Sequence, residues 1–293
     1  SQAQEDCSRG ACYPPSDDLL LGRVDQLQAS STCGLTGSEI FCTPYQQMKC
    51  CPCDSRNPNS QLAHTLQNVL STSGSDRWWQ SRKPVTLQLD LNNLFQLDNL
   101  ILMFKLQGPR PSALVIERKL DNDRTWQPVL YLATDCEQAF PGVPTRTPLT
   151  LDQTYCYTLP PTGTNPYQDH TIEFSPLRQY AYVPAPNSQK IEVSGLTGLR
   201  VRLTELGDVP RLPGRSLSRF YALKEMRVIG SCMCHGHANR CLPQEYNNQL
   251  SPTVQCDCQH NTAGVNCERC ADLYNDLPWR PAEEGNTHTC KRK

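Results

Sequence analysis

The chain has 293 residues, of which 17 are cysteine, and its 28 Lys and Arg against 29 Asp and Glu give a formal net charge of -1. This near balance argues against general nucleic-acid binding, which requires a basic face to offset phosphate charge. No stretch of about 18 uninterrupted apolar residues occurs, so we expect no membrane span. The cysteine content indicates an oxidising compartment. The polar start at Ser1 to Asp6 is not a signal peptide, so we expect that any such segment has been removed.

The cysteines fall into three groups. Seven precede residue 54, two lie at Cys136 and Cys156, and eight fall between Cys232 and Cys290. So many cysteines in a short stretch with little apolar sequence indicate that disulfides replace a hydrophobic core there. The nine cysteines before Cys232 are an odd number, so one thiol there is unpaired or bonded to another chain, and the adjacent Cys50 and Cys51 are the natural place for it. Zinc is the alternative, and the Cys-x-Cys spacing argues against it.

The stretch from residue 78 to 231 predicts β-structure. Leu87, Leu89 and Leu91 alternate with polar residues, which predicts a half-buried strand, and the apolar run Leu100 to Phe104 predicts a strand buried on both faces. Further strands are expected at residues 113–117, 129–133, 171–174, 199–203 and 221–229, with Gly- and Pro-rich breakers between them. Short strands without a long helical pattern predict an antiparallel β-sandwich, with helix confined to short pieces such as Gln61 to Val69.

Trp78 and Trp79 stand just before the first clear strand. We interpret them as large apolar rings that close one end of the sandwich, with their N–H groups hydrogen-bonded. The alternative is an exposed aromatic platform for a sugar or a protein.

The C-terminal cysteines follow a specific pattern. The segments Cys232-Met-Cys234-His-Gly-His-Ala, Asn261-Thr-Ala-Gly264 and Cys267-Glu-Arg-Cys270 occur in this order. In these motifs the sequence resembles a laminin-type epidermal-growth-factor-like (EGF-like) module, present once over residues 232–293. The resemblance implies the disulfides Cys232–Cys241, Cys234–Cys256, Cys258–Cys267 and Cys270–Cys290.

The rest of the chain also carries family motifs. Cys7-Ser-Arg-Gly-Ala-Cys12, Ser31-Thr-Cys33-Gly-Leu35, Trp78-Trp-Gln-Ser81, Ile116-Glu-Arg118 and Phe220-Tyr-Ala222 resemble the laminin N-terminal domain of β chains. The resemblance implies that residues 1–231 form a jelly-roll-type β-sandwich with long loops. It makes plausible the disulfides Cys7–Cys12, Cys33–Cys53, Cys136–Cys156, and Cys42 with Cys50 or Cys51. We adopt Cys42–Cys50, which leaves Cys51 as the candidate free thiol.

Signs of catalysis are lacking in the sequence. It contains no Gly-x-Ser-x-Gly elbow, phosphate-binding loop or His-Glu-x-x-His helix, so we expect a protein that is not an enzyme and carries no cofactor. Relatives of the N-terminal domain hold a structural calcium in the loop before the tryptophans. Here that loop offers only Ser71 and Asp76 as weak ligand candidates beside Arg77, and calcium prefers several oxygens including carboxylates.

Basic residues gather between positions 200 and 219. One interpretation is a solvated face balanced by Glu205, Asp208 and Glu225. The other is a binding face for heparan sulfate or an acidic partner. The residues concerned are Arg200, Arg202, Arg211, Arg215 and Arg219.

The resemblance implies a secreted structural protein of the extracellular matrix, acting at the tip of a laminin β short arm in basement membranes and cell adhesion. Its expected partners are laminin α and γ chains, with no nucleic acid and no membrane insertion. Many β relatives carry an acidic Glu-Gly-Glu segment before the strand at Thr171, where this chain has Pro160-Pro-Thr-Gly-Thr-Asn-Pro166. That departure favours anchoring to another matrix protein, such as a collagen. The alternatives are a netrin-like secreted receptor ligand and a heparan-sulfate-binding module.

Overall fold

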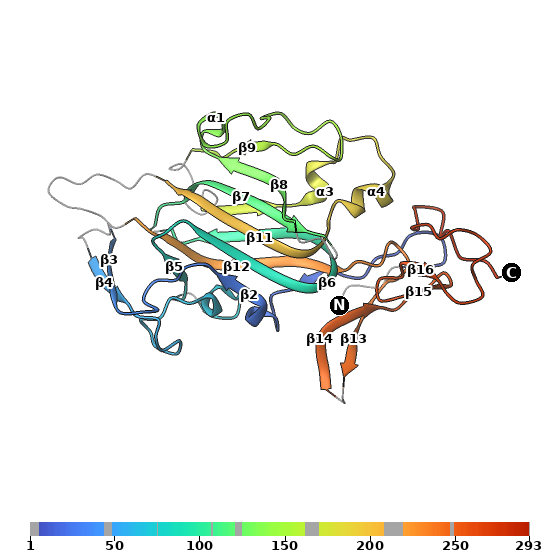
Figure 1. The fold of residues 1–293 in the computed structure, drawn as a ribbon, viewed down its shortest axis with the longest axis horizontal. Helices are drawn as coiled ribbons and strands as arrows, with labels where there is room; N and C mark the ends of the chain where they lie inside the picture. The colour runs from blue at the N-terminus through green and yellow to red at the C-terminus, as the bar shows by residue number, and fades with distance from the viewer. Residues whose placement is uncertain are drawn as a thin grey trace.

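The computed structural model describes residues 6–43, 49–74, 76–106, 108–120, 125–161, 170–207, 219–246 and 249–292. Figure 1 shows a broad β-sandwich at one end and a small module, with its own hairpin, at the other. The strands of the larger region are β1 (Asp17–Asp18), β2 (Leu27–Ala29), β3 (Glu39–Thr43), β4 (Lys49–Cys53), β5 (Trp79–Ser81), β6 (Val85–Phe104), β7 (Pro111–Lys119), β8 (Gln127–Ala133), β9 (Cys156–Thr158), β10 (Thr171–Phe174), β11 (Gly195–Leu206) and β12 (Tyr221–Cys232).

The long strand β6 organises the sandwich. The sequence predicts two strands here, and the structure joins them into one of 20 residues, with a kink where Asn92 has a φ of 64°. Asparagine tolerates this left-handed conformation better than most residues. The first half of β6 pairs with β2 and β11, and the second half pairs with β10 and β12. The single strand β6 is therefore hydrogen-bonded to four other strands, β2, β10, β11 and β12.

The structure confirms that the remaining predicted segments are strands, and it corrects two details of their pairing and burial. Among the named strands of the described residues, the pairing is antiparallel as expected, except that β8 and β9 are parallel. The run Leu100 to Phe104 is not buried on both faces, because Leu102 and Phe104 are buried while Ile101 and Met103 keep partial exposure. A sandwich strand turns one face to the opposite sheet and the other outward, so only alternate side chains enter the core.

Helix is short throughout the described residues. The segment expected to be helical between Gln61 and Val69 forms only one 3₁₀ turn, η2 (Leu66–Val69). The other pieces are η1 (Val24–Gln26), α1 (Cys136–Ala139), α3 (Pro176–Gln179) and α4 (Asn187–Glu192). In the part of the chain described above, no helix is long and apolar enough to cross a bilayer.

The core of the sandwich is aliphatic. Leu87, Leu89, Leu102 and Val201 are each no more than 1% exposed, and they belong to one continuous cluster that also includes Trp79. Trp79 is fully buried, and its Nε1 donates to Thr32 Oγ1 at 3.0 Å. Trp79 is therefore a buried apolar ring with its N–H hydrogen-bonded, as interpreted, whereas Trp78 is only half-buried and its Nε1 donates to Gln80 Oε1 at 3.0 Å.

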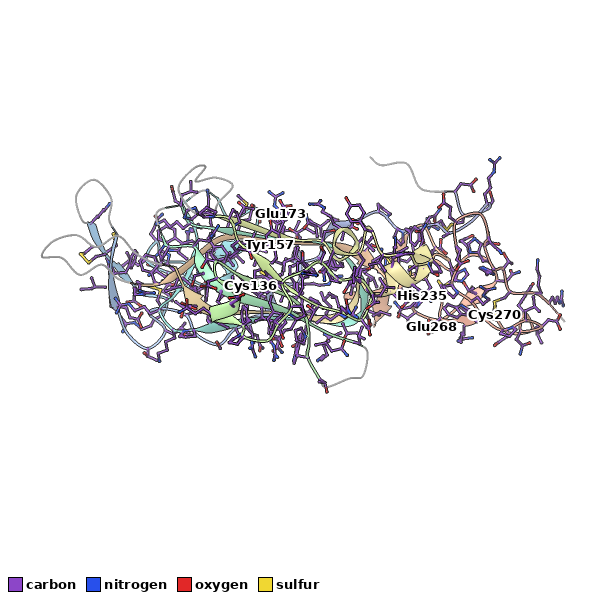
Figure 2. All side chains as sticks on the ribbon, turned by 90° about the horizontal axis from the view of Figure 1, so that it is seen from above. Cys136, Tyr157, Glu173, His235, Glu268 and Cys270 are labelled. Carbon is purple, nitrogen blue, oxygen red and sulfur yellow. A yellow bond between two sulfur atoms is a disulfide. The ribbon has the colours of Figure 1, made fainter. Side chains whose placement is uncertain are left out.

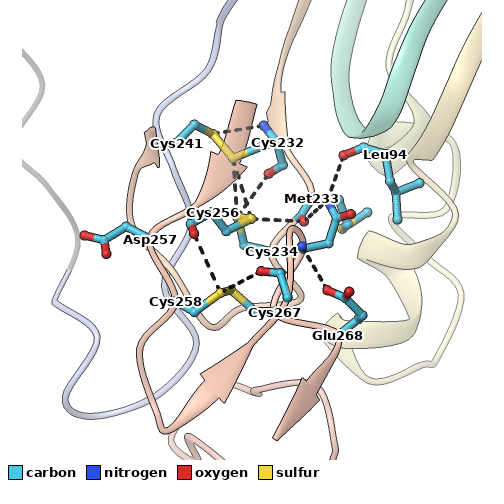
Figure 3. Close-up of a disulfide and its surroundings, with 12 residues drawn as sticks. Leu94, Cys232, Met233, Cys234, Cys241, Cys256, Asp257, Cys258, Cys267 and Glu268 are labelled. Carbon is cyan, nitrogen blue, oxygen red and sulfur yellow. Dashed lines mark hydrogen bonds between the residues drawn. A yellow bond between two sulfur atoms is a disulfide. The ribbon is translucent and has the colours of Figure 1, made fainter. Parts of the chain in front are cut away.

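The small module is stabilised by disulfide bonds. Its strands β13 (Cys241–Tyr246), β14 (Gln249–Cys256), β15 (Thr262–Ala263) and β16 (Arg269–Cys270) form two hairpin-like pairs. Figure 3 shows the disulfides at its centre, beside Met233 and beside Leu94, which belongs to β6 of the sandwich. The module contains the pairs Cys232–Cys241, Cys234–Cys256, Cys258–Cys267 and Cys270–Cys290. The sandwich contains Cys7–Cys12, Cys33–Cys53, Cys42–Cys50 and Cys136–Cys156, and Cys51 is a free cysteine.

Candidate functional site

A groove of about 620 Å³ opens on the sandwich beside β10 and α3. Leu132 of β8 and Ile172 of β10 form part of its apolar floor. Tyr157 and Tyr182 line it as well, and their side chains are 47% and 96% exposed. Figure 2 shows Tyr157 and Glu173 close together along this side of the sandwich. Exposed tyrosines over an apolar floor are typical of surfaces that bind other proteins.

The groove also carries charge. Arg110 is only 5% exposed, and its Nη2 donates to the carbonyl oxygen of Pro160 at 2.7 Å. Arg178 and Glu173 line the groove and are exposed. No sequence pattern reveals this groove, because Tyr157 lies in β9 and Tyr182 lies in a loop after α3, where burial follows no regular period.

The arginines expected to form a basic face are partly neutralised. Arg200 makes two hydrogen bonds to the Glu117 carboxylate, each of 3.1 Å, and Arg202 Nε lies 3.3 Å from the same group. Glu117 is only 5% exposed. Arg200 also lies over the ring of Trp126 at 4.6 Å. The counter-ion of Arg200 and Arg202 is therefore Glu117 on the neighbouring strand β7, and it is not one of the acids suggested by the sequence.

The other members of this basic group are placed less closely. Arg219 is exposed and its Nη2 donates to the carbonyl oxygen of Leu206. Arg211 and Arg215 lie outside the described residues. Of the five arginines, the structure thus brings together Arg200 and Arg202.

The free cysteine lies beside a stack of aromatic and basic side chains. Cys51 and Trp78 are half-buried against the cluster that contains Phe41. Lys105 Nζ lies 3.5 Å from the centre of the Trp78 ring, and His64 stacks on that ring at 4.2 Å. Burial lowers the pKa of the Lys105 ammonium. Trp78 is thus a packing platform for Lys105 and His64.

The calcium candidates do not converge on a common point with other acids. Ser71 and Asp76 are both exposed, in the turn between η2 and β5. Among the described residues, the one group of three or more His, Cys, Asp or Glu side chains close enough to share an ion is Cys232, Cys234 and Cys256. Those three sulfurs are bonded in disulfides and are not thiolate ligands.

The module and the sandwich are joined by many contacts. Ser188 Oγ of α4 donates to Glu283 Oε1 at 3.1 Å, and Glu192 lies 2.5 Å from His235 Nδ1. Asn266 Nδ2 donates to the carbonyl oxygen of Leu94 at the β6 kink. The N-terminal segment adds a backbone bond from Cys12 N–H to Gly236 O, of 2.9 Å. These contacts fix the direction in which the module leaves the sandwich.

Comparison with known proteins gives two family matches in chain order. Residues 12–230 match the family described as Laminin N-terminal (Domain VI), and residues 232–290 match the Laminin EGF domain. Human laminin subunit beta-2 is 40% identical over 98% of this chain, and mouse laminin subunit beta-1 is 38% identical over 98%. Mouse netrin-4 is 34% identical over 96% of this chain and 48% of its own length.

The chain spans about 17% of the length of the laminin relatives it matches. Among solved structures, a chitosan-binding module from Paenibacillus sp. IK-5 matches 72% of this chain and 98% of its own, with a TM-score of 0.36 and 13% identity. That similarity is too low to carry an argument about function.

Proposed function

We propose, because this chain belongs to the laminin N-terminal (Domain VI) family, that it forms the tip of a laminin β short arm in the extracellular matrix. The observation that carries the proposal is the order and extent of the two family matches, over residues 12–230 and 232–290. It supports a division into an N-terminal domain of residues 1–231 and a first EGF-like module of residues 232–293. We infer that the protein is secreted into basement membranes and acts by binding, without catalysis.

Two features of the structure support a binding role. The hydrogen bonds between α4, the β6 kink and the module would let the tip present its surfaces in a fixed direction. The groove offers exposed Tyr157 and Tyr182 beside charged side chains. The partners we infer are laminin α and γ chains in a three-way node, or another matrix protein such as a collagen.

Sedimentation velocity tests the choice between these partners. The chain is mixed with laminin α and γ N-terminal fragments, first with calcium and then with a chelator. A three-component species supports the node, and its loss on chelation supports a structural calcium. A chain that stays monomeric in every mixture rules out node formation and leaves anchoring, which a collagen-binding assay then tests directly.

The groove can be tested within the same assay. Tyr157→Ser together with Tyr182→Ser removes the two exposed rings, and we expect the weight-average sedimentation coefficient of the mixture to fall toward that of free components. Leu35→Ser is the matched control, because Leu35 is 54% exposed and does not line the groove. Equal effects from the groove variant and the control would place the interface elsewhere.

The subtype and the alternatives are finer proposals. The segments Met48-Lys-Cys-Cys-Pro-Cys53 and Gly108-Pro109 look most like beta-three chains, whereas the relatives named above are of other subtypes. A netrin-like receptor ligand is an alternative because netrin-4 is 34% identical to this chain, and titration of a netrin receptor tests that alternative.

Heparan-sulfate binding is the other alternative. Retention on a heparin column that neither salt nor Arg202→Glu changes would rule it out.

A further inference from the structure

Two histidine rings meet inside the joint between the sandwich and the module. His237 is fully buried, and its Nδ1 lies 2.8 Å from Nδ1 of His260. The outer nitrogen of each ring faces a backbone carbonyl. His237 Nε2 lies 2.7 Å from Arg280 O, and His260 Nε2 is hydrogen-bonded to Cys7 O. The pair therefore connects the N-terminal disulfide loop with two segments of the module.

These contacts determine how many protons the pair holds. A carbonyl oxygen can only accept a hydrogen bond, so both Nε2 atoms must carry protons. If each ring were neutral, both Nδ1 atoms would then present lone pairs to each other across 2.8 Å. If each ring were cationic, two N–H groups would face each other. A favourable contact needs one proton between the two Nδ1 atoms, so the pair holds three protons and one positive charge.

A metal ion does not fit between the same two atoms. Zinc–nitrogen bonds of about 2.0–2.1 Å at tetrahedral angles would hold the two nitrogens more than about 3 Å apart. The observed 2.8 Å is an ordinary distance for an N–H···N hydrogen bond.

The surroundings disfavour a positive charge on the His237 ring. Burial lowers the pKa of His237 to about 4, with His260, His235 and His288 adding repulsion, so its ring is the neutral one. His260 lines an open cleft with the carboxylates of Asp6 and Asp257, while Arg240 in that cleft is bound to Asp257 at 2.6 Å. Two further histidines at the joint also face carboxylates, His235 with Glu192 and His288 with Glu283.

We propose that His237 and His260 bind one shared proton, and that this proton holds the N-terminal disulfide loop against the module and closes the joint within a limited band of pH. Removing the proton sets two lone pairs against each other. Adding one more sets two N–H groups against each other. Either change weakens the contact that ties Cys7 O to the module through His260.

Proton counting gives the expected pH profile of joint opening. An imidazole released to water titrates near pH 6.5. Above that pH the open joint holds two protons and the closed joint three, so the opening equilibrium grows about tenfold per pH unit as pH rises. Below it the open joint holds four protons, so opening grows about tenfold per pH unit as pH falls. Closure is therefore strongest near pH 6.5. A pair with only two protons would instead give a flat profile above that pH.

Amide hydrogen exchange across about pH 5 to 8 measures this profile, after correction for the intrinsic pH dependence of exchange. The reporters are Gln259 N–H, bonded to His237 O at 2.7 Å, and Cys290 N–H, bonded to His260 O at 3.0 Å. Leu97 N–H, bonded to Ser194 O in the sandwich, is the reference. We expect protection of both reporters to peak near pH 6.5 relative to the reference. Protection that is flat above pH 6.5 would overturn the proposal.

Two variants sharpen the test. His260→Gln removes the shared proton. In this variant we expect joint opening to stop increasing as pH rises above about 6.5 (the alkaline limb), and still to increase as pH falls below about 6.5 (the acid limb), because His237 takes up one proton when it is released. His288→Gln is the matched control: His288 also lies at the joint, bonded to Glu283 at 3.4 Å, and its variant should keep both limbs. Should His260→Gln fail to fold, nitrogen NMR of the unaltered chain at pH 7 decides. Three protonated ring nitrogens in the pair support the proposal, and two overturn it.

Discussion

The sandwich and the module solve the same stability problem by different means. In the sandwich, thirty of the described buried side chains form one hydrophobic cluster, mostly Leu, Val and Phe. In the module, the corresponding cluster has five members, of which four are disulfide cysteines and the other is Ala238. A stretch of 59 residues cannot bury enough apolar surface to offset its conformational entropy, so covalent links that restrict the unfolded chain take over. The two regions should therefore respond oppositely to reduction and to core truncation.

Reduction of the disulfides should have the largest effect, and it should fall on the module. Each native bridge in a small secreted domain contributes about 2–5 kcal/mol, so the loss of four is as large as the usual stability of a whole domain. We expect a reductant to expose residues 232–290 to limited proteolysis while the sandwich resists. Mass spectrometry of the fragments locates the cuts. Simultaneous digestion of both regions would show that the sandwich also depends on its disulfides.

Core truncation should affect the sandwich in the same way that reduction affects the module. Leu102 is fully buried in β6, and Leu102→Ala should lower the free energy of unfolding of the sandwich by about 2–5 kcal/mol. Ile101→Ala is the matched control, because Ile101 is adjacent in the same strand and only half-buried. Denaturant titration measures both, and we expect the control to lose clearly less. Equal losses would mean that β6 is covered equally on its two faces.

Sequence reasoning succeeded where one physical signal dominates. Alternating leucines in β6 and the run at Thr171 to Phe174 reveal strands because burial follows a period of two. It failed where structure depends on distant partners. The parallel pairing of β9, the Glu117 counter-ion of Arg200 and the contact of His237 with His260 each join segments whose proximity no local pattern encodes. The groove tyrosines were missed for the same reason.

Acid should weaken the sandwich through a second buried histidine. Burial lowers the pKa of His64 to about 4, and its side chain is stacked on Trp78. The unfolded chain takes up this proton near pH 6.5 and the folded chain only near pH 4, so the stability that depends on neutral His64 is lost as pH falls through that interval. The total loss is about 3 kcal/mol.

Denaturant titrations at several pH values test this acid limb. His64→Phe keeps an aromatic ring beside Trp78 and should flatten the slope between pH 6.5 and 4. His170→Gln is the control for the loss of a histidine elsewhere in the sandwich. The profile differs from that of the joint, because His64 gives an acid limb only. A slope that His64→Phe does not alter would assign the acid sensitivity to other groups.

Ion pairs at the surface should contribute equally to the stability of the sandwich and of the module. This contribution should be the smallest of those compared. Arg202 in the sandwich pairs with Glu117 at 3.3 Å, and Arg240 in the module pairs with Asp257 at 2.6 Å; their side chains are 46% and 52% exposed. Water screens the half-exposed arginine of each pair, and the buried Glu117 keeps its two hydrogen bonds from Arg200 when Arg202 is removed, so Arg202→Gln and Arg240→Gln should each cost no more than about 1 kcal/mol. Denaturant titration at low and high salt measures the effect of Arg202→Gln. Hydrogen exchange in the module, also at low and high salt, measures the effect of Arg240→Gln. A larger loss from Arg240→Gln than from Arg202→Gln would mean that a region without an apolar core relies on its surface charges as well as on its disulfides.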